Sequence, residues 1–227
     1  SDLRRKTLLD TLVQEAAPNT IHPFVCDTND KQSIQTALKH CLQKLGNMDI
    51  FIANAGISES SPSDTLNAAL YERVFQTNVF GLLYSYEVLV PHMIANKKGH
   101  LISMGSLAGY RGLPGSGAYC SSKAAVMALT ESMRKDLKPF NIHVSLITPG
   151  FIKSAITDRN LFHMPFLQET QQGAEKIYKA IINKKPIYAF PAPLSTLVKC
   201  LRLLPPRLYD AILGNVKNKK KGTTHEH

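Results

Sequence analysis

Tyr119 and Lys123 are the residues of this chain whose types and spacing point most directly to proton transfer. They stand four residues apart in a segment with helical periodicity, so both side chains lie on one face of the predicted helix. A phenol has an ordinary pKa of about 10, and a neighbouring ammonium group favours the ionised phenol and lowers that pKa. The pair could therefore act as an acid and base, with Lys123 adjusting the pKa of Tyr119.

Two further polar residues could take part in the same chemistry. Ser106 follows a predicted strand, and its hydroxyl could either donate a hydrogen bond to a substrate carbonyl or cap the next helix. Asn78 lies inside a helical pattern, where asparagine is unfavourable because its amide competes for backbone groups. Asn78 is therefore either a functional residue or an exposed polar residue without a role.

Strands and helices alternate along the chain, and this order predicts how the polar residues are positioned. The alternation favours an α/β fold, a Rossmann-like, doubly wound parallel sheet with helices on both faces. Ligands of such sheets bind beyond the carboxyl ends of the strands, where residues 54–56, Ser106 and residues 149–150 fall. The strand at 48–53 is expected to be buried on both faces. The predicted strands are residues 21–26, 48–53, 100–104, 143–147 and 187–190, and the predicted helices are residues 6–15, 34–45, 67–95, 117–138 and 171–183.

The chain resembles the short-chain dehydrogenase/reductase family in five short motifs. The resemblance runs from about residue 24 to residue 157, and its motifs are specific because five of them occur in the family's order and spacing. The matching motifs are Asn54-Ala55-Gly56, Asn78-Val79-Phe80-Gly81, Ser106, Tyr119-Cys120-Ser121-Ser122-Lys123 and Pro149-Gly150.

The resemblance implies an NAD(P)-dependent oxidoreductase that interconverts a secondary alcohol and a ketone. It implies that Tyr119 is the acid/base, that Lys123 lowers its pKa and holds the nicotinamide ribose, and that Ser106 binds the substrate oxygen. Asn78 would hold a water that relays protons to Lys123. No metal is implied. The cofactor-binding set implied by the family consists of Arg4, Asp27, Asn54, Ala55, Gly56, Tyr119, Lys123, Pro149, Gly150 and Ile152.

One part of the family pattern is missing from the sequence. No glycine-rich TGxxxGxG turn precedes Asp27, so the first strand–helix–strand unit, whose turn would receive the pyrophosphate, is not present. We expect an N-terminal portion outside this sequence rather than a natural truncation. Arg4 near the start favours NADP, because arginine pairs well with a 2′-phosphate, whereas Asp2 would suit NAD.

The C-terminal part changes in character. We expect an oxidoreductase domain over residues 1–190 and an amphipathic extension with a basic tail over residues 191–227. The loop at 151–167 is apolar and suits a lipophilic substrate, or else packs as core or as a subunit contact. Residues 192–221 either pack on the domain or contact a membrane surface peripherally.

Composition restricts the remaining functions. The net charge is +10 over 227 residues, and Lys217, Lys219, Lys220 and Lys221 supply four of those charges. A solvated tail is favoured over a nucleic-acid site, and no nucleic-acid partner is expected. We expect a cytoplasmic protein, with membrane association as an alternative, that forms a homodimer or homotetramer. The alternative function is an inactive nucleotide-binding or scaffold protein on the same fold.

Overall fold

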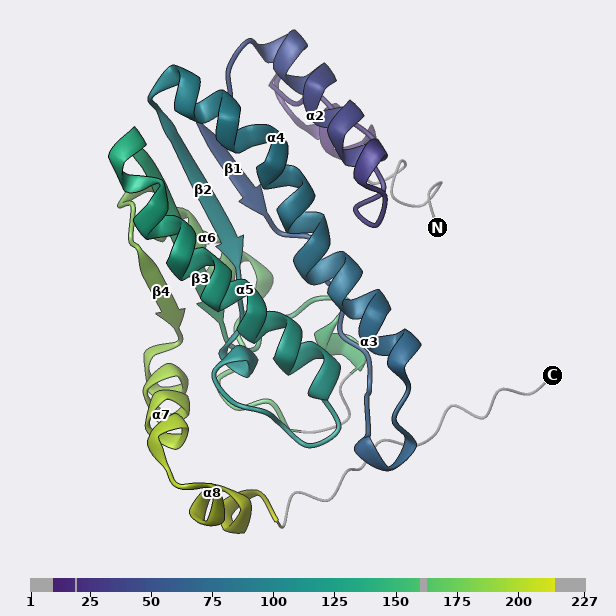
Figure 1. The fold of residues 1–227 in the computed structure, drawn as a ribbon, viewed down its shortest axis with the longest axis vertical. Helices are drawn as coiled ribbons and strands as arrows, with labels where there is room; N and C mark the ends of the chain where they lie inside the picture. The colour runs from purple at the N-terminus through teal and green to yellow at the C-terminus, as the bar shows by residue number, and fades with distance from the viewer. Residues whose placement is uncertain (1–9, 19, 160–162, 215–227) are drawn as a thin grey trace, which may run out of the picture.

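A four-stranded parallel sheet forms the centre of the molecule (Figure 1). The computed structural model describes residues 10–18, 20–159 and 163–214. Neighbouring strands follow one another in chain order, from β1 at one edge to β4 at the other. Each connection between them contains a helix, as parallel pairing requires. The strands are β1 (Ile50–Ala53), β2 (Gly99–Met104), β3 (Ile142–Pro149) and β4 (Ile187–Phe190).

Helices cover both faces of this sheet, which confirms the predicted fold class (Figure 1). On β2, Leu101 belongs to the core beneath α4 and α5, whereas its neighbour Ile102 belongs to the core beneath α6. Successive residues of a strand point to opposite faces, so one apolar run serves both cores. The helices are α2 (Lys31–Leu45), α3 (Ala68–Phe75), α4 (Gly81–Asn96), α5 (Gly117–Asp136), α6 (Thr170–Ile182), α7 (Ala192–Leu203) and α8 (Pro206–Leu213).

The helical region predicted over residues 67–95 is interrupted by a π-helical turn. This turn, η2 (Gln76–Phe80), separates α3 from α4 and contains Asn78. Single π turns inside helices recur at functional sites. Just beyond the turn, a Cβ on Gly81 would lie 2.7 Å from the backbone oxygen of Thr28, so glycine lets another segment approach closely.

Two expectations for the first half of the chain are wrong. Residues 21–26 form no strand, and Val25 is 69% exposed. A strand needs a hydrogen-bonded neighbour, and among the described residues nothing pairs with this segment. β1 is likewise not buried on both faces, because it is the edge strand of the described sheet, and Ile50 and Ile52 are 45% and 44% exposed.

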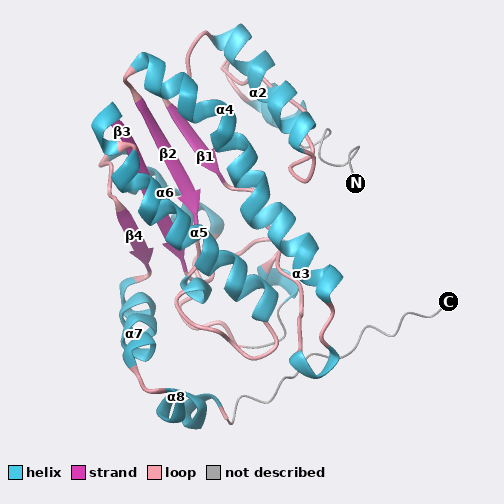
Figure 2. Cartoon of the chain, in the orientation of Figure 1, coloured by secondary structure: helices cyan, strands magenta, loops and turns pink. Residues whose placement is uncertain are grey.

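The last two helices, α7 and α8, pack on the loop between β2 and α5 (Figure 2). Arg111 of that loop donates hydrogen bonds to the backbone oxygens of Leu201, Arg202 and Leu204 at 2.7, 3.1 and 2.8 Å. Its guanidinium carbon lies 3.8 Å from the centre of the Tyr209 ring. The Tyr209 hydroxyl donates to the oxygen of Gly112 at 2.6 Å. These contacts attach the C-terminal segment to the part of the chain that separates Ser106 from Tyr119.

The other helices form close to their predicted positions. Residues 10–15 are helical, and the remainder of the helix predicted over residues 6–15 lies outside the described residues. Within the part of the chain that the structure describes, no helix is long and apolar enough to cross a membrane.

Candidate active site

The candidate catalytic side chains come together at the carboxyl ends of the strands. Ser106 follows β2, Lys123 and Tyr119 lie in the first turns of α5, and Asn78 projects from the π turn. The start of α5 is fixed from elsewhere in the chain, because the backbone N–H of Ala118 donates to the Ser61 hydroxyl at 3.0 Å. Ser61 is itself buried. A serine 57 residues away thus caps the helix that carries Tyr119 and Lys123.

Lys123 is a buried cation, with 5% of its surface exposed. Its Nζ donates to the backbone oxygen of Met104 at 2.8 Å and lies 5.8 Å from the centre of the Tyr119 ring. Burial lowers the pKa of Lys123 to about 8, because an ammonium group loses hydration there. A Cβ on Gly56 would lie 3.4 Å from this Nζ and 3.3 Å from the Asn78 Oδ1. Because glycine has no Cβ, position 56 avoids a close contact with both side chains.

Tyr119 is half-buried, and burial raises the pKa of its phenol. A hydrogen bond with the Ser106 side chain acts in the opposite direction and lowers this pKa. We expected Lys123 to lower it. The net direction in the structure is upward because burial outweighs the effect of Ser106, and a lowering by Lys123 stays a prediction. The phenol is therefore protonated at neutral pH, as a proton donor to a carbonyl must be.

Ser106 has one of the two roles considered for it, that of a cap, and its hydrogen bond to a substrate carbonyl stays a prediction. Its hydroxyl oxygen accepts from the backbone N–H of Ala108 at 3.1 Å and so caps the short 3-10 turn η3 (Leu107–Gly109). The same side chain lies close enough to Tyr119 to lower the pKa of its phenol. A Cβ on Gly109 would lie 2.9 Å from the carbonyl carbon of Lys123, so this turn sits directly against α5.

Asn78 is fully engaged in hydrogen bonds. Its Nδ2 donates to the backbone oxygen of Ile57 at 3.0 Å and to the Ser122 hydroxyl at 2.9 Å, and its Oδ1 accepts from the N–H of Ile57 at 2.8 Å. Only 2% of the residue is exposed. Asn78 therefore links the segment after β1 to α5, and the expectation of an exposed residue without a role is wrong. Its relay water stays a prediction.

Two predicted cofactor residues line one cavity beside β1, and a third, Asp27, is adjacent to it in the sequence. Asn54 and Ala55 line this cavity of about 300 Å³ together with Cys26 and Thr28, the two neighbours of Asp27. The Asp27 carboxylate accepts from the backbone N–H of Asn29 at 2.9 Å. The structure thus brings the predicted adenine residue and the strand-end motif to the same place.

Three further predicted cofactor residues, Pro149, Gly150 and Ile152, lie at the end of β3. The N–H of Gly150 donates to the oxygen of Phe190 at 2.7 Å, and a Cβ there would meet Leu194 of α7 at 2.8 Å. The side chain of Ile152 packs on Gly173 of α6. Its backbone, like that of Pro149 and Gly150, remains at the strand end. Arg4 lies outside the described residues.

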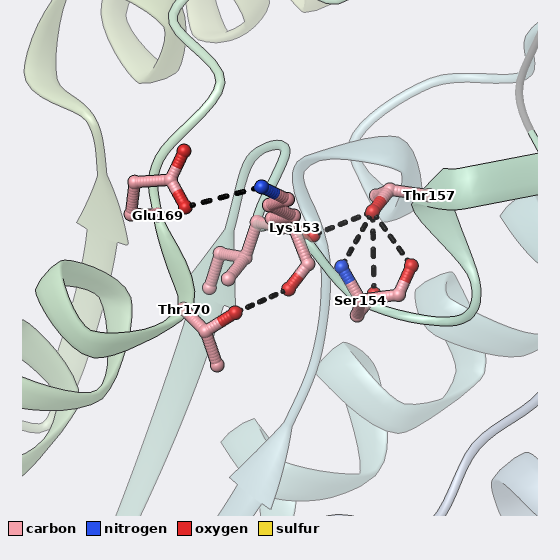
Figure 3. Close-up of polar contacts among 6 residues, drawn as sticks. Lys153, Ser154, Thr157, Glu169 and Thr170 are labelled. Atoms are coloured by element: carbon pink, nitrogen blue, oxygen red, sulfur yellow. Dashed lines mark hydrogen bonds and ion pairs between the residues drawn. The ribbon is translucent and has the colours of Figure 1, made fainter.

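The loop after β3 is closed at its base by polar contacts (Figure 3). The Thr157 hydroxyl accepts from the N–H of Ser154 at 2.8 Å and lies 2.9 Å from the oxygen of Ile152, to which it donates. The Thr170 hydroxyl donates to the oxygen of Lys153 at 2.8 Å, and the Lys153 ammonium lies 3.6 Å from the Glu169 carboxylate. These contacts give the predicted apolar loop a fixed start and end.

Sequence reasoning missed several residues that position the site. Ser61, Arg111, Ser122 and Tyr209 all make contacts that fix α5 or the loop before it. Ser122 alone carried a hint, because it lies between Tyr119 and Lys123 on the same helix. Among the described residues, no group of three or more histidine, cysteine, aspartate or glutamate side chains could hold a metal ion.

Known proteins are similar to this chain in sequence and in fold. Residues 3–163 match the family model described as short chain dehydrogenase. An uncharacterized oxidoreductase of Myxococcus xanthus is 34% identical over 210 residues, which cover 92% of this chain and 83% of the relative. The crystal structure of a short-chain dehydrogenase from Streptomyces avermitilis has a TM-score of 0.79 at 22% identity and covers 94% of this chain and 86% of its own. ElxO with NADP bound has a TM-score of 0.71 at 20% identity and covers 82% of each chain.

The chain therefore belongs to the short-chain dehydrogenase/reductase family of oxidoreductases. The solved structures support the same fold, which agrees with the resemblance inferred from the sequence motifs.

Proposed function

We propose that this enzyme interconverts a secondary alcohol and a ketone with NADP(H), and that Tyr119 is its acid/base. The observation that carries the proposal is that the buried ammonium of Lys123 lies 5.8 Å from the centre of the Tyr119 ring at the carboxyl ends of β2 and β3, with Ser106 close enough to lower the pKa of the phenol. Parallel sheets bind ligands at this end. Family membership supports NAD(P) chemistry, and the neighbour ElxO binds NADP.

The residues of the chain fit the nicotinamide half of such a cofactor. Gly56 leaves space beside Lys123, whose ammonium could donate to ribose hydroxyls, and Pro149 and Gly150 border the same strand ends. Asp27, Asn54 and Ala55 would take the adenosine half, around the cavity at the end of β1. When bound, the cofactor supplies or accepts the hydride.

The protein's own residues handle the proton. In ketone reduction, Ser106 would donate a hydrogen bond to the carbonyl oxygen and Tyr119 would transfer its phenolic proton to it. A raised pKa keeps Tyr119 protonated and ready for this direction. In alcohol oxidation the phenolate would accept the proton, and the ammonium of Lys123 would stabilise that anion. Asn78 holds the segment after β1 against α5 and so keeps this set in place.

Replacement of Tyr119 by phenylalanine tests the assignment. The variant should lose almost all NADPH-dependent ketone reduction, because the proton donor is gone, and it should still bind NADPH by fluorescence titration. Ser121→Ala is a matched control on the exposed face of the same turn. Full turnover by Tyr119→Phe would refute the assignment of Tyr119 as the acid/base. No turnover by the wild-type protein, with NADPH binding retained, would instead favour the inactive nucleotide-binding protein.

A lipophilic substrate fits the surface of the loop after β3. Ile156, Phe166 and Leu167 are 39%, 53% and 41% exposed, so this loop presents apolar side chains beyond its closed base. An apolar wall near the site would favour long-chain alcohols and ketones. Values of kcat/KM should rise with alkyl chain length in a homologous series of ketones, and a flat series would contradict the assignment.

Peripheral contact with an anionic membrane is supported by α7 and α8. Leu197, Leu203, Leu208 and Ile212 are 53%, 84%, 56% and 53% exposed, and basic residues Lys199, Arg202 and Arg207 are exposed among them. One side of both helices packs on the domain and the other side is exposed. Packing on the domain and peripheral contact with a membrane could therefore both occur, on opposite sides of these helices. Co-sedimentation with phosphatidylserine vesicles should fall when Leu203 and Leu208 become serine. The dimer or tetramer implied by the family remains a prediction for light scattering.

A further inference from the structure

A second cavity lies at the opposite end of the sheet from the active site. It has a volume of about 450 Å³ and is bordered by the last turn of α5, the start of β3 and the turn before β4. β3 has eight residues, so at about 3.3 Å per residue its two ends are roughly 23 Å apart. A ligand in this cavity would therefore not contact Ser106, Tyr119 or a cofactor at the carboxyl ends of the strands.

The lining of this cavity is strongly basic. Arg134, Lys135, Lys138 and Lys184 contribute four permanent cations, and His143 lies among them. No carboxylate belongs to the lining. The nearest acidic partner recorded for these residues is Glu131, whose oxygen is 3.9 Å from Arg134 and whose side chain is 72% exposed. Such a distant and solvated partner compensates little of the charge.

Arg134 is also incompletely hydrogen-bonded. Its Nη1 is buried and has no partner among the described residues. A buried N–H without an acceptor costs free energy, and a guanidinium group is especially suited to two oxygens of one anion.

Burial and, to a smaller extent, the charge of Lys184 lower the pKa values of the two histidines beside the cavity. The pKa of His143 is lowered first by burial and then by the charge of Lys184. Beneath it, the pKa of buried His100 is lowered to about 4, mainly by burial, with further contributions from His143 and Lys184. The charge of Lys184 thus acts across the amino ends of β2 and β3.

We propose that this cavity binds the phosphate group of a small soluble anion, at a site separate from the cofactor's. A guanidinium and three ammonium groups around one concave space suit a dianion with several oxygens, because charge-assisted hydrogen bonds to phosphate are strong. The volume of the cavity leaves room for a phosphorylated metabolite beyond the phosphate itself. Binding here would compensate positive charges that no carboxylate of the described lining neutralises.

Histidine NMR of the full chain tests the proposal with inorganic phosphate as the probe. The titration is run at constant ionic strength against chloride, and His143→Gln assigns the His143 resonance. Phosphate should raise the pKa of His143 by about half a unit or more, since a nearby anion favours the imidazolium. The cofactor's own phosphate sites do not affect this readout, because they lie at the other end of β3.

A double variant and a matched control make the test specific. Lys138→Gln with Lys184→Gln should weaken phosphate binding by about tenfold or more, because two charged donors are lost. Lys39→Gln with Lys44→Gln removes the same charge from exposed positions on α2 and should leave the affinity unchanged. Equal responses in all three proteins would mean general screening and would overturn the site.

A last comparison separates a soluble ligand from a lipid headgroup, which carries the same phosphate chemistry. Glycerol 3-phosphate should shift His143 as inorganic phosphate does. If only vesicles of phosphatidylcholine with phosphatidic acid bind through Lys138 and Lys184, and glycerol 3-phosphate does not bind, the soluble ligand is refuted.

Discussion

Replacement of Lys123 by methionine should change how the stability of the cofactor-free protein depends on pH. The side chain is 5% exposed, and burial lowers its pKa from 10.5 to about 8. The difference, 10.5 − 8, is 2.5 pKa units, which corresponds to about 3 kcal/mol. This free energy is the cost of keeping a proton on the buried amine.

The sign of the effect follows from proton counting. Below pH 8 the amine is protonated in both states, and the folded protein bears the whole cost. Between pH 8 and 10.5 the unfolded chain holds a proton that the folded protein has released, so stability rises with pH. Between pH 7 and 9.5 the wild-type protein should gain about 2 kcal/mol relative to Lys123→Met.

Urea unfolding of both proteins at each pH measures this gain. Burial raises the pKa of Cys120, but the contribution of this thiol is present in both proteins and cancels in the difference between them. The lost hydrogen bond to Met104 shifts the variant by a constant and leaves the slope unchanged. A difference that stays flat from pH 7 to 9.5, or falls, would show that the ammonium of Lys123 is not desolvated in the folded protein.

Three other outcomes follow from the structure. Gly81→Ala should cost about 1–3 kcal/mol in urea unfolding, because its Cβ would lie 2.7 Å from the Thr28 oxygen; unchanged stability would mean that this contact relaxes freely. Tyr209→Phe should lower the free energy of unfolding by about 1 kcal/mol because the hydrogen bond to Gly112 is lost, and kcat should fall as well. A kcat equal to that of the wild type would show that α8 does not position the active site. Because burial raises the pKa of Tyr119, ketone reduction should be flat across neutral pH while alcohol oxidation rises toward alkaline pH; parallel profiles would point to another acid/base.

The central strands and the residues at their ends could be predicted from the sequence because the relevant patterns are local. Residues 100–104 and 143–147 are short apolar runs followed by small or polar residues, and the structure extends the first by one residue and the second by three. A parallel order then brings their carboxyl ends together, which places Ser106 beside the helix that carries Tyr119.

The remaining features depend on contacts between distant residues. The π turn around Asn78 changes the helix by only a fraction of a turn, which hydrophobic periodicity does not reveal. The side-chain amide of Asn78 is hydrogen-bonded to Ile57, which lies 21 residues earlier in the sequence. Apolar residues 21–26 predicted a strand, but strand formation requires a hydrogen-bonded neighbour that composition does not specify. The pKa of Tyr119 is raised mainly by burial, and the four-residue spacing between Tyr119 and Lys123 does not show how deeply the phenol is buried.

The contacts of Arg111 also bear on when the active site can form during translation. The loop that it belongs to lies between Ser106 and Tyr119, yet its carbonyl partners at Leu201 and beyond are synthesised 90 or more residues later. During translation this loop therefore lacks its hydrogen bonds to α7 at a stage when all four strands, from β1 to β4, have already been synthesised. The catalytic end of the domain can be completed only after α7 and α8 have left the ribosome, so the enzyme should become active late in its own synthesis.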